Sequence, residues 1–302
     1  MSARAAFHLL DVFTRRKLEG RPLAVLDCES ALEPREMALL AHELAAPTTA
    51  FVLPARDPIN TARLVSFSPQ GEEHALAPHA AIGAAAVLAQ SRAPEILAHR
   101  SVVVTIETRD ETRACEVIRS RHGTVYAELA LDRAPVRRDA SIDPMGLAQA
   151  VGLHAGDLGF GAHEPRVYDC LAPYCLAPVR SRSTLERARP VKAALAPLLG
   201  AAQGLYLYAA DPNESDAAIH ARLINRDGAD ALASGKALAA FAGAALEFER
   251  PSDGPHELVV EQGHAAGRPA RLTLRMEVFN GSLANLHIGG QTTPIVSGVL
   301  QL

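Results

Sequence analysis

The order of apolar and polar residues along the chain predicts a mixed α/β protein. Residues 7–13 and 23–27 are short apolar runs separated by polar, turn-forming residues, which is the pattern of a β-hairpin. Residues 34–45 carry apolar side chains at helical spacing after a proline suited to a first turn. Residues 51–53 and 62–67 predict the next two strands.

Two segments are apolar around their whole circumference and are expected to form buried central helices. The first is PHAAIGAAAVLAQ at residues 78–90, and the second is SGKALAAFAGAALEF at residues 234–248. Strands are expected over 204–210 and 217–224, so the order strand, strand, loop, buried helix occurs twice. This recurrence predicts two copies of one unit, whose helix starts could face one cleft as anion sites.

Other stretches give weaker local expectations. Residues 144–151 predict a helix, and residues 184–199 predict a single longer one. Gly289 and Gly290 near the C-terminus are expected to form a turn, because no helix follows them. We expect the chain to divide into an N-terminal half, residues 1–120, and a C-terminal half, residues 121–282. Strands in residues 283–302 are expected to return to the N-terminal half.

Composition and charge narrow the classes of partner. The 302 residues include 48% apolar residues, enough for a sizeable core, and the net charge is -4. No basic block is present, so a nucleic-acid partner is not expected. The four cysteines lack C-x-x-C spacing and no export segment is evident, which predicts a reduced, cytoplasmic setting. The apolar runs are too short to span a bilayer, so no membrane partner is expected.

Six motifs in collinear order resemble the phenazine-biosynthesis PhzF-like family. DVFT followed by GRPLAV resembles that family's opening D-V-F-T…G-N-P-x-A-V, and TTAFVLP resembles its S-E-T-T-F-V. FSPQGE resembles F-T-P-x-x-E, and PHAAIG stands where the family has G-H-P-T-L-G. DALASGKA resembles E-D-P-A-T-G-S-A, and the segments EQG, GRP and IGGQTTP resemble the family's closing motifs.

The resemblance implies the fold that this family shares with diaminopimelate epimerase and proline racemase. That fold is mixed α/β with two similar halves, each a curved sheet around a central helix, and its active site lies in the cleft between them. The resemblance also implies a homodimer and no cofactor or metal. The small anionic metabolite that we expect as a partner follows instead from the two helix starts and from Lys236. The histidines outside these motifs, His220 among them, do not show the sequence spacing of a metal-binding site.

Several positions depart from the catalytic pattern that the resemblance implies. In the family a glutamate moves a proton, and a histidine, an aspartate and a serine assist it. Those positions are Thr48, His79, Ala231 and Lys236 here, so only the histidine is retained. The two-thiol racemases of this fold have a cysteine at each helix start, where this chain has Pro78 and Ser234. A two-thiol mechanism is therefore excluded by this alignment.

Two residues are candidates for proton transfer. His79 has the motif position and an ordinary pKa near neutrality; its alternative role is a buried histidine bonded to backbone. Asp230 could replace the lost aspartate from one position away, or it could be a solvated loop residue.

Five further residues are candidates for substrate binding: Thr48, Thr49, Ser234, Gly235 and Lys236. The threonines precede a strand, where threonine is ordinary, and Ser234 could simply cap its helix. Lys236 could attract a carboxylate or phosphate, act as an amine catalyst, or extend its side chain to solvent.

These observations lead to two hypotheses of different classes. The first is a divergent PhzF-like isomerase or epimerase that acts on a small anionic metabolite by cofactor-independent proton transfer. The second is a non-catalytic binding or regulatory protein on the same fold, because the glutamate and aspartate positions are Thr48 and Ala231.

Overall fold

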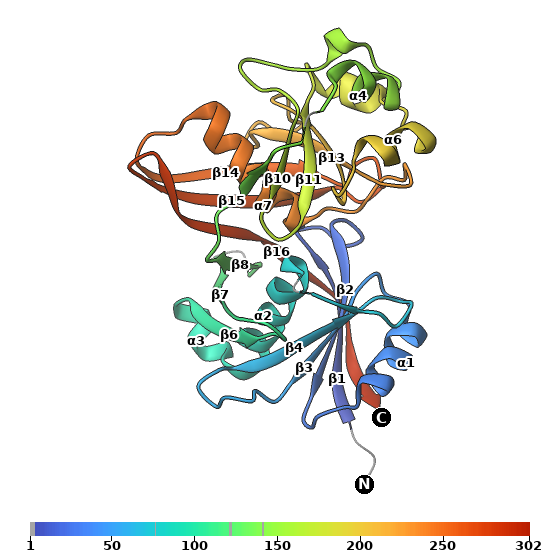
Figure 1. Cartoon of the computed structure of the whole chain (residues 1–302). Coiled ribbons are helices and arrows are strands. Elements are labelled where there is room, and N and C mark those ends of the chain that lie inside the picture. Colours follow the sequence, from blue (N-terminus) through green and yellow to red (C-terminus); the bar gives the residue numbers. More distant parts are fainter. Residues whose placement is uncertain (1–3, 76, 121–122, 141) are drawn as a thin grey trace. The chain divides into compact units, whose positions relative to one another are not determined.

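Two units, each built around one buried helix, make up the chain in a computed structural model that describes residues 4–75, 77–120, 123–140 and 142–302. The first unit comprises Met1–Ala130 and Gly289–Leu302, and the second comprises Leu131–Ile288 (Figure 1). None of the helices in these described ranges has both the length and the apolar character needed to cross a bilayer.

Among its described residues, the first unit contains eight strands and three helices before the chain enters the second unit. Its strands are β1 (Arg4–Val12), β2 (Arg21–Cys28), β3 (Thr49–Leu53), β4 (Ala62–Phe67), β5 (Glu73–His74), β6 (Val102–Glu107), β7 (Thr112–Arg119) and β8 (Val125–Leu131). Its helices are α1 (Pro34–Leu44), α2 (Pro78–Arg92) and α3 (Pro94–His99).

The second unit contains the remaining elements. Its strands are β9 (Val136–Arg138), β10 (Arg166–Asp169), β11 (Pro173–Pro178), β12 (Gly204–Ala209), β13 (Ile219–Asn225), β14 (Gly254–Gln262) and β15 (Ala270–Phe279). Its helices are α4 (Pro144–Ala150), the 3-10 turn η1 (Ala155–Asp157), α5 (Arg182–Arg187), α6 (Lys192–Leu198), α7 (Gly235–Ala244) and the π-helical turn η2 (Ala245–Glu249). The last strand, β16 (Ser282–Gln301), passes from the second unit into the first, where Thr292 pairs with Val12 and Gln301 with Arg4 of β1.

Strand pairing repeats between the units and confirms the predicted internal duplication. In the first unit β1 and β2 are antiparallel, β2 and β3 parallel, β3 and β4 antiparallel, β4 and β6 parallel, and β6 and β7 antiparallel. In the second unit β10, β11, β12, β13, β14 and β15 pair in the same alternation. The central helix occupies the same place in both, after β4 and after β13.

Burial explains why both central helices are apolar on all sides. Every residue of α2 from Pro78 to Ala89 is buried, and α2 packs against strands β1, β2, β3, β4, β6 and β7 (Figure 1). Helix α7 packs against β9, β10, β11 and β15, and only Lys236 among its residues is not buried. The predicted central helices are therefore confirmed, and the small alanine side chains let strands pack closely on every face.

Two local expectations were wrong. The single helix expected over residues 184–199 is two helices, α5 and α6, separated by a segment that contains Pro190. Proline disfavours helical geometry at the residue before it, so the helix ends there. Gly289 and Gly290 lie within β16 and form no turn. A Cβ on Gly289 would lie 2.1 Å from the Tyr126 hydroxyl, so this glycine serves close packing.

The tight fit around α2 gives a stability prediction. A Cβ on Gly83 would lie 2.3 Å from Leu23 Cδ2 and 3.2 Å from Leu10 and Val12. G83A should therefore lower the free energy of unfolding by about 1–3 kcal/mol, as overpacked cores do. Urea unfolding measures this change, with G298A as the control because Gly298 has open space around it. Equal stabilities for the two variants would contradict this account of the helix packing.

Candidate active site

Three polar side chains meet at the start of α2 in the first unit. His79 is the second residue of α2, is 5% exposed, and places Nε2 3.0 Å from Thr48 Oγ1. The Arg21 guanidinium donates from Nε to the same His79 Nε2 at 3.2 Å. We call Arg21, Thr48 and His79 the α2 cluster.

Strand order explains how the α2 cluster forms from distant parts of the sequence. Arg21 is the first residue of β2, and Thr48 directly precedes β3. These strands are parallel, with Ala24 opposite Thr49, and the Ala24 N–H donates to the Thr48 carbonyl at 3.0 Å. Parallel strands start at the same edge of a sheet, so both side chains lie at one edge, where α2 also starts.

The hydrogen bonds define the state of the His79 ring. A guanidinium group can only donate, so His79 Nε2 accepts and its proton is on Nδ1, which leaves the ring neutral. The α2 cluster therefore combines a neutral imidazole with local positive charge, a combination suited to an anionic ligand.

Thr49 has a different environment from Thr48. Side chains alternate along an extended strand, so Thr49 points away from the side on which Thr48 meets His79. Its hydroxyl is fully buried and has no hydrogen-bond partner within the described part of the chain. A ligand-binding role for Thr49 stays a prediction that this geometry does not strengthen.

A second polar group lies at the start of α7 in the second unit. Ser234 is the N-cap, and its Oγ accepts from the Ala237 N–H at 3.2 Å, so the capping role is confirmed. The Ser234 N–H donates at 3.0 Å to Gln262 Oε1 at the end of β14. Gly235 and the half-buried Lys236 follow as the first residues of the helix. We call Ser234, Gly235, Lys236 and Gln262 the α7 cluster.

Gln262 and Arg21 are site residues that the sequence reasoning did not select. The Gln262 side chain is fully buried, and its Nε2 group has no hydrogen-bond partner among the described residues. An amide donor buried in this way costs free energy unless a ligand or water accepts from it. Both residues lie inside motifs that carry the resemblance, GRPLAV and EQG, so motif membership was the available signal.

Asp230 forms an ion pair. Its carboxylate accepts from Arg222 Nε at 2.7 Å and from Arg222 Nη2 at 3.2 Å, which occupies both oxygens. Arg222 also donates from Nη1 to the carbonyls of Leu185 and Ala188, so the pair connects the loop before α7 to α5. This arrangement gives Asp230 an anchoring role, and its predicted catalytic role would require the ion pair to open.

The four cysteines lie outside both clusters. All are free and buried. Burial raises the pKa of Cys115, near Glu128, and of Cys175 to about 12, so neither thiol forms a thiolate at neutral pH.

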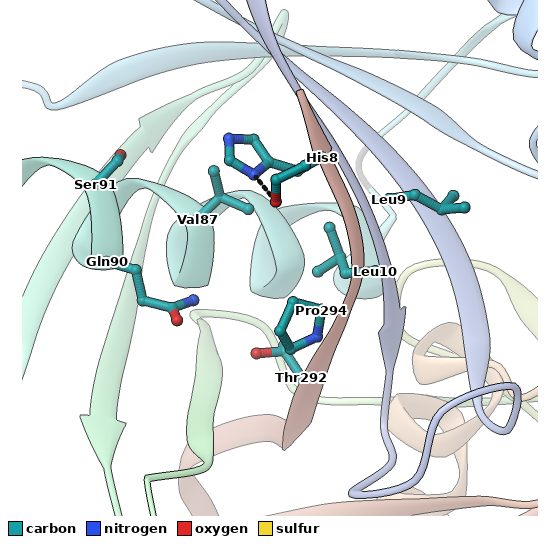
Figure 2. A pocket seen from close by; sticks show the side chains of 9 residues that line it. His8, Leu9, Leu10, Val87, Gln90, Ser91, Thr292 and Pro294 are labelled. Carbon is teal, nitrogen blue, oxygen red and sulfur yellow. Dashed lines mark hydrogen bonds between the residues drawn. The ribbon is translucent and has the colours of Figure 1, made fainter. Parts of the chain in front are cut away.

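One cavity of about 220 Å³ lies within the first unit, away from the α2 cluster. It is lined by β1, β16 and the second half of α2, including His8, Val87, Gln90 and Thr292 (Figure 2). His8 Nδ1 lies 3.2 Å from Ser297 Oγ, and burial lowers the pKa of His8 despite the nearby Asp27. His79 lies in the first turn of α2, whereas this cavity borders the second half of the helix. The cavity and the α2 cluster are therefore separate features.

Comparison with known proteins identifies the family. The family model described as "Phenazine biosynthesis-like protein" matches residues 10–298. The chain belongs to this family. An uncharacterized isomerase of Mesorhizobium japonicum is 34% identical over 303 residues, with 97% of each chain covered.

Solved structures agree with the family assignment. A predicted epimerase from Pseudomonas aeruginosa has a TM-score of 0.76 at 29% identity, with 99% of each chain covered. A PhzF-family protein from Bacillus anthracis has a TM-score of 0.84 at 20% identity, also with 99% of each chain covered. The resemblance and the expected fold class are thus confirmed for this chain, and the relatives support an isomerase or epimerase.

The assignment of the His79 proton can be tested by nitrogen-15 NMR. In the wild-type chain at neutral pH, the nitrogen-15 chemical shifts of the His79 ring should show an unprotonated Nε2 and a protonated Nδ1. R21Q removes the charged donor that faces Nε2, so part of the His79 rings should then carry a proton on Nε2. T48V keeps the Arg21 donor and should retain the wild-type pattern. A protonated Nε2 in the wild-type protein would refute the assignment.

Proposed function

We propose that this chain is an isomerase or epimerase that moves a proton on a small anionic metabolite without a cofactor. The observation that carries the proposal is the neutral, buried His79, whose Nε2 lone pair faces Thr48 and Arg21. Proton transfer requires a base within hydrogen-bond reach of an acidified C–H, and His79 is the member of the α2 cluster that can act as one.

The proposed reaction has two proton steps. Arg21 Nε first turns from His79 to the anionic group of the substrate, which frees the His79 Nε2 lone pair. A substrate C–H beside a carboxylate or carbonyl group then loses its proton to His79 Nε2, and the electron pair delocalises into that group. The imidazolium returns the proton to another carbon or to the opposite face. The substrate anion also stabilises the positive charge that forms on the ring.

The α7 cluster supplies anion-binding groups in this proposal. Gln262 offers a buried amide donor, Lys236 offers a charge, and the α7 start adds the positive end of a helix dipole. The homodimer and the cytoplasmic location stay predictions.

Solvent exchange tests the catalytic proposal. The protein is incubated in deuterated water with a panel of 2-hydroxy and 2-amino carboxylates, and deuterium entry at a C–H position is followed by NMR. H79Q should slow the exchange by about 10²–10⁴-fold, the usual contribution of a positioned acid or base. H154Q, at an exposed histidine of the second unit, is the control and should exchange at the wild-type rate.

Two results would decide against catalysis by His79. Exchange at an unchanged rate in H79Q would exclude His79 as the base. Tight binding of a carboxylate with no exchange in the wild-type protein would instead support the non-catalytic binding protein. The second result fits an Asp230 that Arg222 already engages through both oxygens.

Removing the charge of Lys236 tests the anion proposal. K236Q should weaken binding of the same carboxylates or of inorganic phosphate by about tenfold, because bonds to charged groups are worth about 1.5–3 kcal/mol. Isothermal titration calorimetry measures this loss. K192Q is the matched control, because Lys192 is an exposed lysine at the start of α6. Equal affinities for wild type and K236Q would exclude Lys236 from anion binding.

A further inference from the structure

Two histidines and a glutamate converge on one point of the second unit, separate from the residues of the α7 cluster. His220 is 2% exposed and Glu261 is 1% exposed, and they are paired opposite each other on the parallel strands β13 and β14. His264 follows in the turn after β14 and is half-buried. The ligand atoms of the three side chains all lie within 4.8 Å of one another.

Strand geometry places this group on the opposite face of β14 from Gln262. Successive side chains on a strand alternate, so Gln262 points toward Ser234 while Glu261 points toward His220. The turn at Gly263 has a φ of +80°, and a Cβ there would lie 2.4 Å from the Arg268 carbonyl. This tight turn brings His264 back over the ring of His220, at a centroid distance of 4.6 Å.

Several donors hold the Glu261 carboxylate in this buried position. It accepts from the backbone N–H groups of Asn213 at 2.7 Å and Glu214 at 2.8 Å, and it lies 2.9 Å from His220 Nδ1. Each carboxylate oxygen can accept more than one bond. The group therefore places a buried carboxylate beside two imidazole rings.

We propose that His220, Glu261 and His264 form a binding site for a divalent transition-metal ion of the Zn²⁺ class. Two histidines and one glutamate are a known zinc ligand set, and imidazole nitrogen favours Zn²⁺ over Mg²⁺ or Ca²⁺. The proposal is independent of the reaction proposed above. It departs from the expectation, drawn from the sequence and its resemblance, that the protein binds no metal.

The distances suit replacement of a proton by a metal ion. His220 Nδ1 and Glu261 Oε2 are 2.9 Å apart and share a proton. Tetrahedral ligands with bonds of about 2.0–2.1 Å are about 3.3 Å apart, so these two atoms need to separate by only a few tenths of an ångström. His264 must approach further, by rotation of its side chain in the turn after β14.

Asn213 lies where a further ligand would be. Its Nδ2 is 3.2 Å from His264 Nε2 and 3.4 Å from His220 Nδ1. Its Oδ1 accepts from the Arg182 guanidinium. Metal binding would displace this amide or turn its oxygen toward the ion, at the cost of the contact with Arg182.

A metal ion bound here would also affect the turn after β14. Glu261 and His264 flank Gln262 and Gly263, so an ion held by both closes a small ring around the turn that positions Gln262 against Ser234. Metal binding is thus expected to stabilise the fold of the second unit and to order this turn.

Zinc titration of the untagged protein tests the proposal. After chelator treatment and removal of the chelator, Zn²⁺ alone is titrated calorimetrically into wild type, H264Q and H256Q. We expect one Zn²⁺ per chain in wild type and in H256Q, whose half-buried histidine lies elsewhere in the same unit. H264Q should bind at least about 10–100-fold more weakly, the loss seen even for supporting partners of metal ligands. H264Q leaves the bonds of Glu261 to the backbone intact, which favours folding.

Thermal unfolding provides the second readout. Zn²⁺ should raise the melting temperature of wild type and H256Q but not of H264Q. If the group is only a hydrogen-bonded clamp, wild type will bind no Zn²⁺, or H264Q will bind it as wild type does. Either result would overturn the metal site.

Discussion

The burial of α2 from Pro78 to Ala89, and of α7 apart from Lys236, is the constraint on which the rest of each unit depends. A helix leaves backbone N–H groups unsatisfied at its start, and a buried start has little water to satisfy them. Ser234 meets this need at α7 with a side-chain cap, whereas Ala77 at α2 has no capping side chain. The polar residues of each unit gather around these two helix ends for this reason, and a small anion is a natural ligand there.

The two arginines Arg222 and Arg21 have different partners, and this difference distinguishes a structural ion pair from a possible reactive group. Arg222 uses its guanidinium on Asp230 and on two carbonyls, so it organises the loop that leads to α7. Arg21 instead directs its Nε–H at the ring of His79. The first arrangement neutralises a carboxylate that could have acted as a base, and the second keeps an imidazole neutral. This contrast is the reason why the proton acceptor that we propose lies in the α2 cluster.

Adjacent residues at the end of strand β14 contact two different groups, the start of α7 and the side chain of His220. Alternation directs Gln262 to the start of α7 and Glu261 to His220 on the opposite face. A change in the turn at Gly263 would therefore disturb both sets of contacts. The π-helical turn that follows α7 lies at the other end of that helix and contributes nothing to this arrangement.

The family, the two central helices and the retained His79 could all be predicted from the residues, because collinear motifs and uninterrupted apolar runs are local signals. The two wrong local predictions, the helix through Pro190 and the glycine turn at Gly289, arose where packing or one proline overrode propensity. Three contacts become visible only in the folded chain: Arg21 with His79, Arg222 with Asp230, and His220 with Glu261 and His264. Each of these contacts joins elements through strand pairing or chain reversal, and residue spacing along a sequence does not specify which strands become neighbours.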